Sequence, residues 1–319
     1  MEAVSQLRFK SPPVMLAAWP GLADVGILAI DYLRRQIGAE AFAEIDMSPF
    51  VTPESAVISA GVARLPDTPD SVFHYHYDPD LIVFESGAQV SGRDGIEIVR
   101  AVLDFARQYG VTRIYTADAM PLRQSHSDPS RLFGVANSRG FLAQLEGYGV
   151  SPVDHGRVRG LSGVLLGLAS SMGIDAACIM PSIPSYAGPV AYPKAALVVL
   201  SVLEALLNVR LDHLEIEEAA AEADTILEAI EGRIRERFPS VIRPHDDDAM
   251  HDEQVPPEDS GTRVPRTARN RIEHLFDEVA HDRSKAMELK RELDRWGLYD
   301  EYEDRFLDLF RHSRKDGND

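Results

Sequence analysis

The sequence predicts an α/β domain of three layers, in which helices cover both faces of a mostly parallel sheet. Two observations lead to this fold class. Strand-like and helical runs alternate along the first two thirds of the 319-residue chain, and several strand-like runs are apolar at every position. Strands of that kind are buried on both faces, as in a parallel sheet between helical layers. The last third is rich in Glu and Ala at helical spacing, which predicts a small α-helical C-terminal region.

The pattern opens with a strand, a glycine turn and a helix. Residues 14–19 form a continuous apolar run that a Pro-Gly pair ends. Residues 25–37 carry apolar side chains at helical spacing, and Gly38 suits the C-cap of that helix. Residues 55–65 and 71–77 are short β-type runs separated by turn residues, which predicts a hairpin inserted into the alternation.

The alternation resumes after this hairpin. Its helices begin at residues that favour helix starts, such as Ser138, Ser162 and Pro193. The hairpin is expected to add antiparallel strands at the sheet edge. Further strands are predicted at residues 80–84, 111–117, 132–136 and 174–180, and further helices at residues 94–109, 138–148, 161–172 and 193–208.

Charge divides the chain into two regions. The net charge of −18 is uneven, because residues 1–211 hold 21 acidic and 16 basic side chains, whereas residues 212–319 hold 30 and 17. This step predicts a boundary between an α/β domain and an acidic helical region. Within the second region, residues 239–265 are rich in Pro and Asp and are expected to form a mobile linker. Helices are predicted on either side of this linker, at residues 215–238, 267–279, 284–293 and 299–310.

Composition excludes several classes of protein. The acidic balance disfavours binding to nucleic acid or to an anionic membrane, since both need a basic surface. The N-terminus has no apolar signal core, and the longest apolar run is too short to span a bilayer. The single Cys178 excludes an intrachain disulfide and is expected in the core. We therefore expect a cytoplasmic protein with neither nucleic acid nor membrane as a partner.

Four polar loops that follow predicted strands are the candidate ligand site. Ligands of parallel α/β proteins bind where strands end, and a helix N-terminus offers free amides to an anion. The glycine turn lacks the Lys and Ser/Thr of a phosphate-binding loop, so a tight turn is favoured over a ligand role. No spacing among these loops is one that only catalysis demands, so no catalytic residue is predicted. The candidate ligand-binding residues are Trp19, Gly21, Asp24, Gly26, Glu85, Ser86, Gln89, Asp118 and Tyr186.

Two further motifs have a structural interpretation. The run from Gly160 to Gly163 resembles a nucleophile elbow, but residue 164 is Val where that motif needs Gly, so Ser162 is interpreted as a helix N-cap. His74 and His76 share one face of a predicted strand without an evident third ligand, which favours a surface or interface hairpin over a metal site. No metal and no cofactor is predicted.

An ordered set of segments resembles the proteasome assembly chaperone 2 family. The set covers about residues 10–210 and begins with the glycine turn and the apolar helix after it. The matching segments are Trp19-Pro-Gly-Leu-Ala-Asp-Val-Gly26, Asp31-Tyr32-Leu33, Gly38-Ala-Glu, Phe42-Ala-Glu-Ile-Asp46, residues 81–89, Val111-Thr-Arg-Ile-Tyr115, Phe133-Gly-Val-Ala136, Gly160-Leu-Ser-Gly-Val-Leu-Leu-Gly167 and Pro193-Lys-Ala-Ala196.

The resemblance implies a phosphorylase/hydrolase-like α/β sandwich, related in shape to purine nucleoside phosphorylases. Eukaryotic members of the family act as chaperones in proteasome assembly, and some archaeal members bind proteasome subunits. The family has no agreed catalytic residues, so none is carried over. Some proteasome-binding members end in a tail with a penultimate Tyr, whereas this chain ends Arg-Lys-Asp-Gly-Asn-Asp. That departure weakens an expectation of proteasome docking.

The sequence therefore predicts a non-catalytic assembly or interaction protein that self-associates, with a trimer suggested by analogy to phosphorylase-like folds. Apolar side chains of the tail, including Leu275, Phe276 and Trp296, need burial on this chain or on a neighbouring subunit. The alternative is a protein that binds or converts a nucleoside-like or nucleotide-like ligand at the strand-end loops. In that case Glu85 or Asp24 is the candidate acid or base.

Overall fold

The computed structural model divides the chain into two compact units, Met1–Asp248 and Ala249–Asp319. The boundary predicted after residue 211 from the charge step stays a prediction, and the linker predicted at residues 239–265 lies outside the described residues. The described residues are 7–53, 55–237, Ile272, Leu275, Phe276, Val279, 285–295, Leu298, Tyr302 and Arg305.

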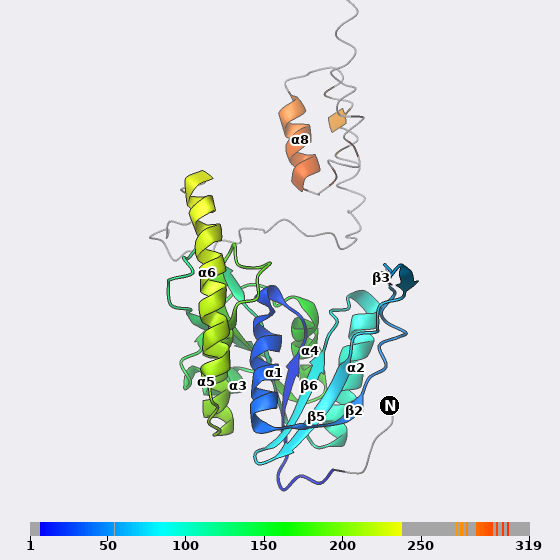
Figure 1. Cartoon of the computed structure of the whole chain (residues 1–319), viewed down its shortest axis with the longest axis vertical. Helices are drawn as coiled ribbons and strands as arrows, with labels where there is room; N and C mark the ends of the chain where they lie inside the picture. Colours follow the sequence, from blue (N-terminus) through cyan, green and yellow to red (C-terminus); the bar gives the residue numbers. More distant parts are fainter. Residues whose placement is uncertain are drawn as a thin grey trace, which may run out of the picture. The chain divides into compact units, whose positions relative to one another are not determined.

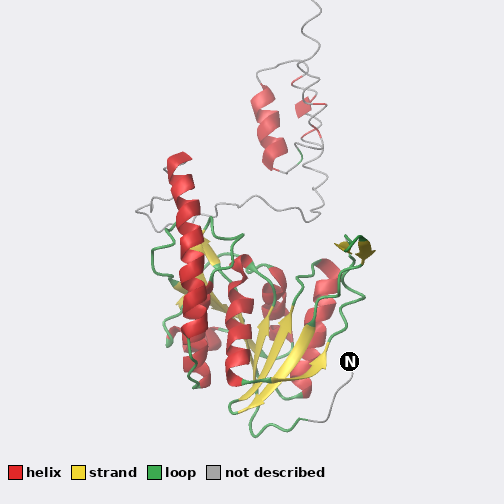
Figure 2. Cartoon of the chain, viewed as in Figure 1, coloured by secondary structure: helices red, strands yellow, loops and turns green. Residues whose placement is uncertain are grey.

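A nine-stranded sheet forms the centre of the first unit (Figures 1 and 2). Its order is β10-β9-β11-β7-β1-β6-β5-β2, with β8 paired to β11. The central strands β6, β1, β7 and β11 are parallel, whereas β9, β5 and β2 introduce antiparallel pairs. The strands are β1 (Val14–Ala18), β2 (Glu40–Glu44), β5 (Ser71–Tyr77), β6 (Asp80–Ser86), β7 (Arg113–Ala117), β8 (Met120–Leu122), β9 (Leu132–Ala136), β10 (Ser151–Pro152) and β11 (Asp175–Pro184).

Helices cover both faces of this sheet, which confirms the predicted α/β class with a mostly parallel sheet. Helices α1, α3 and α5 pack on one face, and α2 and α4 pack on the other. Helix α6 packs on α5 and lies outside that layer (Figure 1). The helices are α1 (Val25–Ile37), α2 (Gly92–Gln108), α3 (Arg139–Glu146), α4 (Gly160–Ser171), α5 (Pro193–Leu207) and α6 (Leu214–Arg237).

The apolar strands are central because both of their faces are buried. In β1, Met15 and Ala17 pack toward α2 and α4, whereas Leu16 and Ala18 pack toward α1 and α5. All four side chains are fully buried. Successive side chains of a strand point to opposite faces, so a strand between two helical layers needs an apolar residue at every position.

The segment before β5 differs from its prediction. Residues 55–65 do not pair with β5 but form a separate two-stranded hairpin of β3 (Val57–Ser59) and β4 (Val62–Arg64). The turn residues Ala60 and Gly61 both have positive φ, as a two-residue hairpin loop of type I′ requires. Strand β5 instead lies in the main sheet between β2 and β6.

The two predicted serine N-caps have different outcomes. The side chain of Ser138 accepts a hydrogen bond from the amide of Phe141 and caps α3 as predicted. The prediction for Ser162 is wrong, because α4 begins at Gly160 with Arg159 as its N-cap. The Ser162 hydroxyl is buried instead in the first turn and lies 2.9 Å from the Thr116 hydroxyl of β7.

The second unit has an apolar core of its own, which includes α8 (Ala286–Arg295). The Arg305 guanidinium lies 4.3 Å from the centre of the Phe276 ring. The described apolar side chains of the tail are thus buried against one another, whereas Trp296 lies outside the described residues. The buried core residues are Ile272, Leu275, Phe276, Val279, Leu289, Leu293 and Leu298.

Candidate functional site

The predicted strand-end loops lie at one edge of the sheet, because they follow β1, β6, β7 and β11, which are parallel neighbours. The loop after β11 starts later than predicted, since residues 181–184 belong to the strand. A shared edge does not bring the candidate side chains together. They divide into three groups, one beside α4, one beside α1 and one beside α6.

The glycine turn after β1 is a tight and strained connection. Ala23 and Asp24 both have positive φ, which costs a non-glycine residue roughly 1–2 kcal/mol. Backbone hydrogen bonds from Ala23 to Gly188 and from Tyr192 to Ala23 hold the turn. A Cβ at Gly26 would lie 2.1 Å from the carbonyl oxygen of Ala117, so this glycine lets α1 approach β7 closely. The Asp24 side chain is exposed and makes no capping hydrogen bond.

Four of the candidate residues belong to the group beside α4. Gln89 cross-links two loops, because its Nε2 donates to the carbonyl of Pro20 and its Oε1 accepts from the amide of Leu161, at 3.0 and 3.2 Å. A Cβ at Gly21 would lie 3.2 Å from Oδ1 of Asp118. Burial raises the pKa of Asp118 against the opposing hydrogen bonds from the amides of Ala119 and Leu22.

Trp19 completes this group. Its ring packs on Phe84, at 5.5 Å between ring centres, and the residue is 3% exposed. Its Nε1 is buried and has no hydrogen-bond partner within the described part of the chain. A buried donor left unpaired costs about 1–3 kcal/mol, and a ligand acceptor at this nitrogen would remove that cost.

Glu85 and Ser86 are adjacent in sequence but face opposite sides of the sheet. Glu85 points toward α1, where its Oε2 accepts a 2.6 Å hydrogen bond from Nε of Arg34. Burial raises the pKa of Glu85 to about 7, against the lowering effect of Arg34. Ser86 is buried, and its hydroxyl accepts a 2.8 Å hydrogen bond from the hydroxyl of Ser71. Both side chains thus have structural partners.

The two candidate histidines lie on β5. Burial lowers the pKa of His74 to about 4, with a further contribution from Arg34, so its ring is neutral near pH 7. Among the described residues, no group of three or more His, Cys, Asp or Glu side chains is arranged to hold a metal ion. Cys178 is fully buried in β11, in agreement with its prediction as a core residue.

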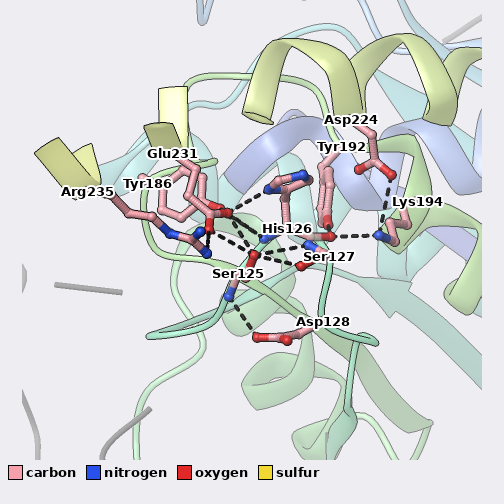
Figure 3. A network of polar contacts seen from close by, with 10 residues as sticks. All are labelled: Ser125, His126, Ser127, Asp128, Tyr186, Tyr192, Lys194, Asp224, Glu231 and Arg235. Carbon is pink, nitrogen blue, oxygen red and sulfur yellow. Dashed lines mark hydrogen bonds and ion pairs between the residues drawn. The ribbon is translucent and has the colours of Figure 1, made fainter. Parts of the chain in front are cut away.

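Tyr186 belongs to a polar network centred on Glu231 of α6, which the sequence did not single out (Figure 3). Glu231 is 3% exposed, although it lies on a helix of the outer layer. Its Oε2 accepts hydrogen bonds from the Ser125 hydroxyl at 2.8 Å, from the His126 amide at 3.2 Å and from the Tyr186 hydroxyl. Its Oε1 accepts from Ser125 at 3.0 Å and pairs with Arg235.

The ring of His126 completes the coordination of this carboxylate. Its Nδ1 lies 2.6 Å from Oε2 of Glu231, and because an ionised carboxylate only accepts hydrogen bonds, Nδ1 carries the proton. Burial opposes ionisation of Glu231, but the hydrogen bonds from Tyr186, His126 and Ser125 outweigh it and lower its pKa to about 2. Burial and the neighbouring carboxylate raise the pKa of Tyr186. Glu231 is therefore a charged, fully hydrogen-bonded side chain near pH 7.

The loop that binds Glu231 is also held from the side of α5. Lys194 and Tyr192 donate hydrogen bonds to the carbonyl of His126, at 2.6 and 3.2 Å. Within the loop, the amide of Ser125 donates to the Asp128 carboxylate at 2.8 Å. The network thus joins the loop after β8, the loop after β11, the start of α5 and the end of α6 (Figure 3).

The spacing of apolar residues in α6 is a sequence signal that points to Glu231. The buried positions of α6 are Ile216, Ala220, Ala223, Leu227 and Glu231, which follow helical spacing along one face. A glutamate on the apolar face of a helix indicates a buried partner, since an ionised carboxylate is costly to bury alone. Ser125 and His126 carry no comparable signal, because they lie in a short loop more than 100 residues away.

A surface cavity of the first unit lies away from these loops. It has a volume of about 560 Å³ and is lined by residues 7–12 and 108–110. Residues 108–110 directly precede β7, so the cavity lies toward the amino end of the sheet. None of the candidate site residues lines it.

Comparisons with known proteins agree with this architecture. Solved structures with the same fold include PbaB of Pyrococcus furiosus, described as an archaeal proteasome activator (24% identity, 72% of this chain and 97% of that chain, TM-score 0.60). PbaA of the same organism, described as an archaeal homolog of proteasome-assembly chaperone, is 20% identical over 72% of this chain and 92% of that chain (TM-score 0.58). A PAC2 family protein from Streptomyces avermitilis is 22% identical over 71% of this chain and 99% of that chain (TM-score 0.57).

At these identities the structural likeness establishes the fold. A search of curated protein sequences found no match. The model of the PAC2 family, in contrast, matches residues 15–231, which is well over half of the chain and reaches from β1 to the Glu231 network. The chain therefore belongs to the PAC2 family.

Proposed function

We propose that this protein is a non-catalytic, chaperone-like interaction protein that self-associates into a homo-oligomer. The observation that carries the proposal is the β3–β4 hairpin, whose large apolar side chains lie in solvent. The exposed fractions are 56% for Val57, 72% for Ile58, 55% for Val62 and 71% for Leu65. The strand register places Val57 and Val62 on one face of the hairpin and Ile58 with Leu65 on the other. Large apolar side chains exposed together on one small element are typical of a protein interaction site.

The hairpin also lacks support from the rest of its own unit. All six strand residues of β3 and β4 are exposed, and the two strands form a sheet apart from the main one. An isolated two-stranded hairpin is marginally stable in water, so contact with another protein surface would stabilise it. Figure 1 shows the hairpin at one end of the first unit, away from the central strands.

The strand-end loops support the non-catalytic part of the proposal. Their polar side chains mostly have structural partners, as shown by the contacts of Glu85 with Arg34 and of Ser86 with Ser71. The similar Pyrococcus furiosus proteins are described as a proteasome activator and as a proteasome-assembly chaperone homolog. Proteasome subunits are therefore the first partner proteins to test, and a trimer is the first oligomer to test.

Light scattering after size exclusion tests self-association directly. We expect the wild-type chain at micromolar concentration to have a mass that is a multiple of 35.3 kDa. Ile58→Asp places a charge on the hairpin face that carries Ile58 and Leu65 and should shift the mass toward one chain. Gln144→Glu is the control, since it adds the same charge at an exposed position of α3, away from the hairpin. A wild-type protein that is strictly monomeric would refute the proposal.

A second candidate function is the binding of a small nucleoside-like or nucleotide-like ligand beside α4. The observation that favours it is the buried Nε1 of Trp19, which has no hydrogen-bond partner among the described residues. Trp19 is two residues before Gly21, and Gly21 lies next to Asp118 in space. A thermal-shift screen with nucleosides, nucleotides and phosphate tests this function, with Asp118→Asn as the variant that should lose any response. An unchanged melting temperature across the screen would count against it.

The cytoplasmic location belongs to the same proposal. None of the described helices combines the length and the apolar character that crossing a membrane requires. Fractionation of cells that express the tagged chain, with recovery in the membrane pellet, would contradict this location.

A further inference from the structure

The Glu231 network has the composition of a carboxylate receptor whose ligand comes from the same chain. Ser125, His126 and Tyr186 supply two hydroxyl groups and one ring nitrogen that point at one pair of oxygens (Figure 3). The backbone amide of His126 is shared between Oε2 of Glu231, at 3.2 Å, and the Tyr186 hydroxyl, at 2.9 Å. Convergent donors of this kind bind carboxylates and phosphates in proteins, because each hydrogen bond to a charged acceptor is stronger than one to a neutral acceptor.

These donors also have partners outside α6. The Ser125 hydroxyl lies 2.9 Å from the Ser127 hydroxyl, and the amide of Asp128 donates to the carbonyl of Ser125. The carbonyl of His126 is held by Lys194 and Tyr192 at the start of α5. Contacts other than those of the Glu231 carboxylate thus hold the loop, as in a preorganised binding site.

The location agrees with a ligand site. The loop with Ser125 and His126 follows β8, and Tyr186 comes just after β11, where β8 and β11 are parallel neighbours. In parallel α/β sheets, ligands bind beyond the carboxyl ends of the strands. Nearby acidic groups do not occupy the donors, because Asp128 accepts from the amide of Ser125 and Asp224 pairs with Lys194.

The last buried side chain of the described part of α6 is the polar Glu231. After Leu227, the remaining turns of α6 bury Glu231, whereas Ile230 and Ile234 are only half-buried. The earlier turns of α6 bury apolar side chains against the domain, whereas its last buried contact is the charged carboxylate of Glu231.

We propose that the Ser125–Ser127 loop and Tyr186 form an oxyanion-binding site, which Glu231 of α6 occupies as an internal ligand. The site takes a carboxylate or a phosphate group, and such a group on a free anion or on a partner protein replaces the Glu231 carboxylate when the end of α6 moves away. This site is distinct from the β3–β4 hairpin, so its test is independent of self-association.

Chemical rescue of the full-length Glu231→Ala variant tests the proposal. The variant leaves the donors in place and empties the position of the carboxylate. Formate should then raise its melting temperature above that in chloride of the same ionic strength, by about 3–6 °C at roughly ten times the dissociation constant. The wild-type chain and Glu228→Ala, which changes an exposed residue of the same helix, should respond much less, because the anion has to displace the Glu231 carboxylate. Adding Tyr186→Phe to Glu231→Ala should weaken the rescue.

A second arm with phosphate identifies the source of the anion. Rescue by formate and acetate alone assigns the site to an acidic side chain, and rescue by phosphate as well assigns it to phosphate-bearing ligands. If Glu231→Ala does not fold, recovery of folded protein on refolding in formate replaces the melting temperature as the readout. The proposal is overturned if Glu231→Gln folds and Glu231→Ala has the same melting temperature in formate, acetate and phosphate as in chloride.

Discussion

Replacing Glu231 by Gln should destabilise the first unit and remove part of its acid sensitivity. The substitution keeps the shape of the side chain but removes its charge. It also turns one acceptor oxygen into an amide donor that faces the donors of Ser125, His126 and Tyr186. A buried set of donors then loses its acceptor, which is more costly than the loss of one exposed hydrogen bond.

The size of the effect follows from the pKa of Glu231. Hydrogen bonds from Tyr186, His126 and Ser125 lower that pKa from 4.5 to about 2. Since each pH unit corresponds to about 1.36 kcal/mol, the ionised form contributes about 3 kcal/mol to the free energy of unfolding. For a unit of this size, a loss of about 3 kcal/mol lowers the melting temperature by roughly 6–12 °C.

The pH dependence gives the sign of the effect. The folded pKa lies below the unfolded value, so the folded state binds fewer protons than the unfolded state between pH 4.5 and about 2. The contribution of Glu231 is therefore complete above pH 4.5 and is lost as the pH falls toward 2. Glu231→Gln should lack this contribution at every pH, so the two proteins should converge in stability as the pH falls.

Urea denaturation followed by circular dichroism measures both quantities. Glu228→Gln is the matched control, because Glu228 is exposed on the same helix and should change stability by less than about 0.5 kcal/mol. A Glu231→Gln variant within about 1 kcal/mol of wild type at neutral pH would refute the reasoning, since its expected loss is about 3 kcal/mol. An unchanged difference between the two proteins from pH 4.5 downward would refute it as well.

Three further predictions concern Gly26, Glu85 and Phe276. Gly26→Ala should lower the free energy of unfolding by about 3 kcal/mol or more, because its Cβ would lie 2.1 Å from the Ala117 carbonyl oxygen. Gly38→Ala is the comparison: its Cβ meets no atom within 4 Å, and its positive φ should cost about 1–2 kcal/mol. Thermal denaturation measures both. Burial lowers the pKa of His74 to about 4 and raises that of Glu85 to about 7, so in wild type their effects on stability oppose each other as the pH falls. Glu85→Gln removes the effect of Glu85, so the free energy of unfolding of this variant should fall by up to about 3 kcal/mol from pH 6.5 to 4. The same pH dependence of stability in both proteins would contradict this. Phe276→Ala should cost the second unit about 3–5 kcal/mol and reduce its helical signal, with the main transition of the first unit unchanged.

Local patterns predicted the elements of the first unit well. Residues 25–37 and 132–136 were predicted as the helix and the strand that the structure contains. Apolar periodicity and cap residues act within a few positions of one another, so one sequence suffices to locate such elements. The hairpin at residues 55–65 was assigned to the wrong partner, because strand pairing depends on segments that are distant in sequence.

The sequence located the loops of the candidate site but not the directions of their side chains. Parallel strands place their carboxyl ends at one edge, which correctly located the four loops. Glu85 and Ser86 nevertheless point to opposite faces of the sheet, and Tyr186 points toward α6. The direction of a side chain at the end of a strand depends on the helix that covers it, and one sequence does not state which helix that is.

The sequence by itself determined the α/β class, the order of most elements and the family resemblance, because these depend on spacing within short segments. Only the tertiary structure decided that Glu231 joins Ser125 and His126 across more than 100 residues. An ionised carboxylate is stable in a buried place only where several donors converge on it, and such convergence exists only when the distant segments have packed together.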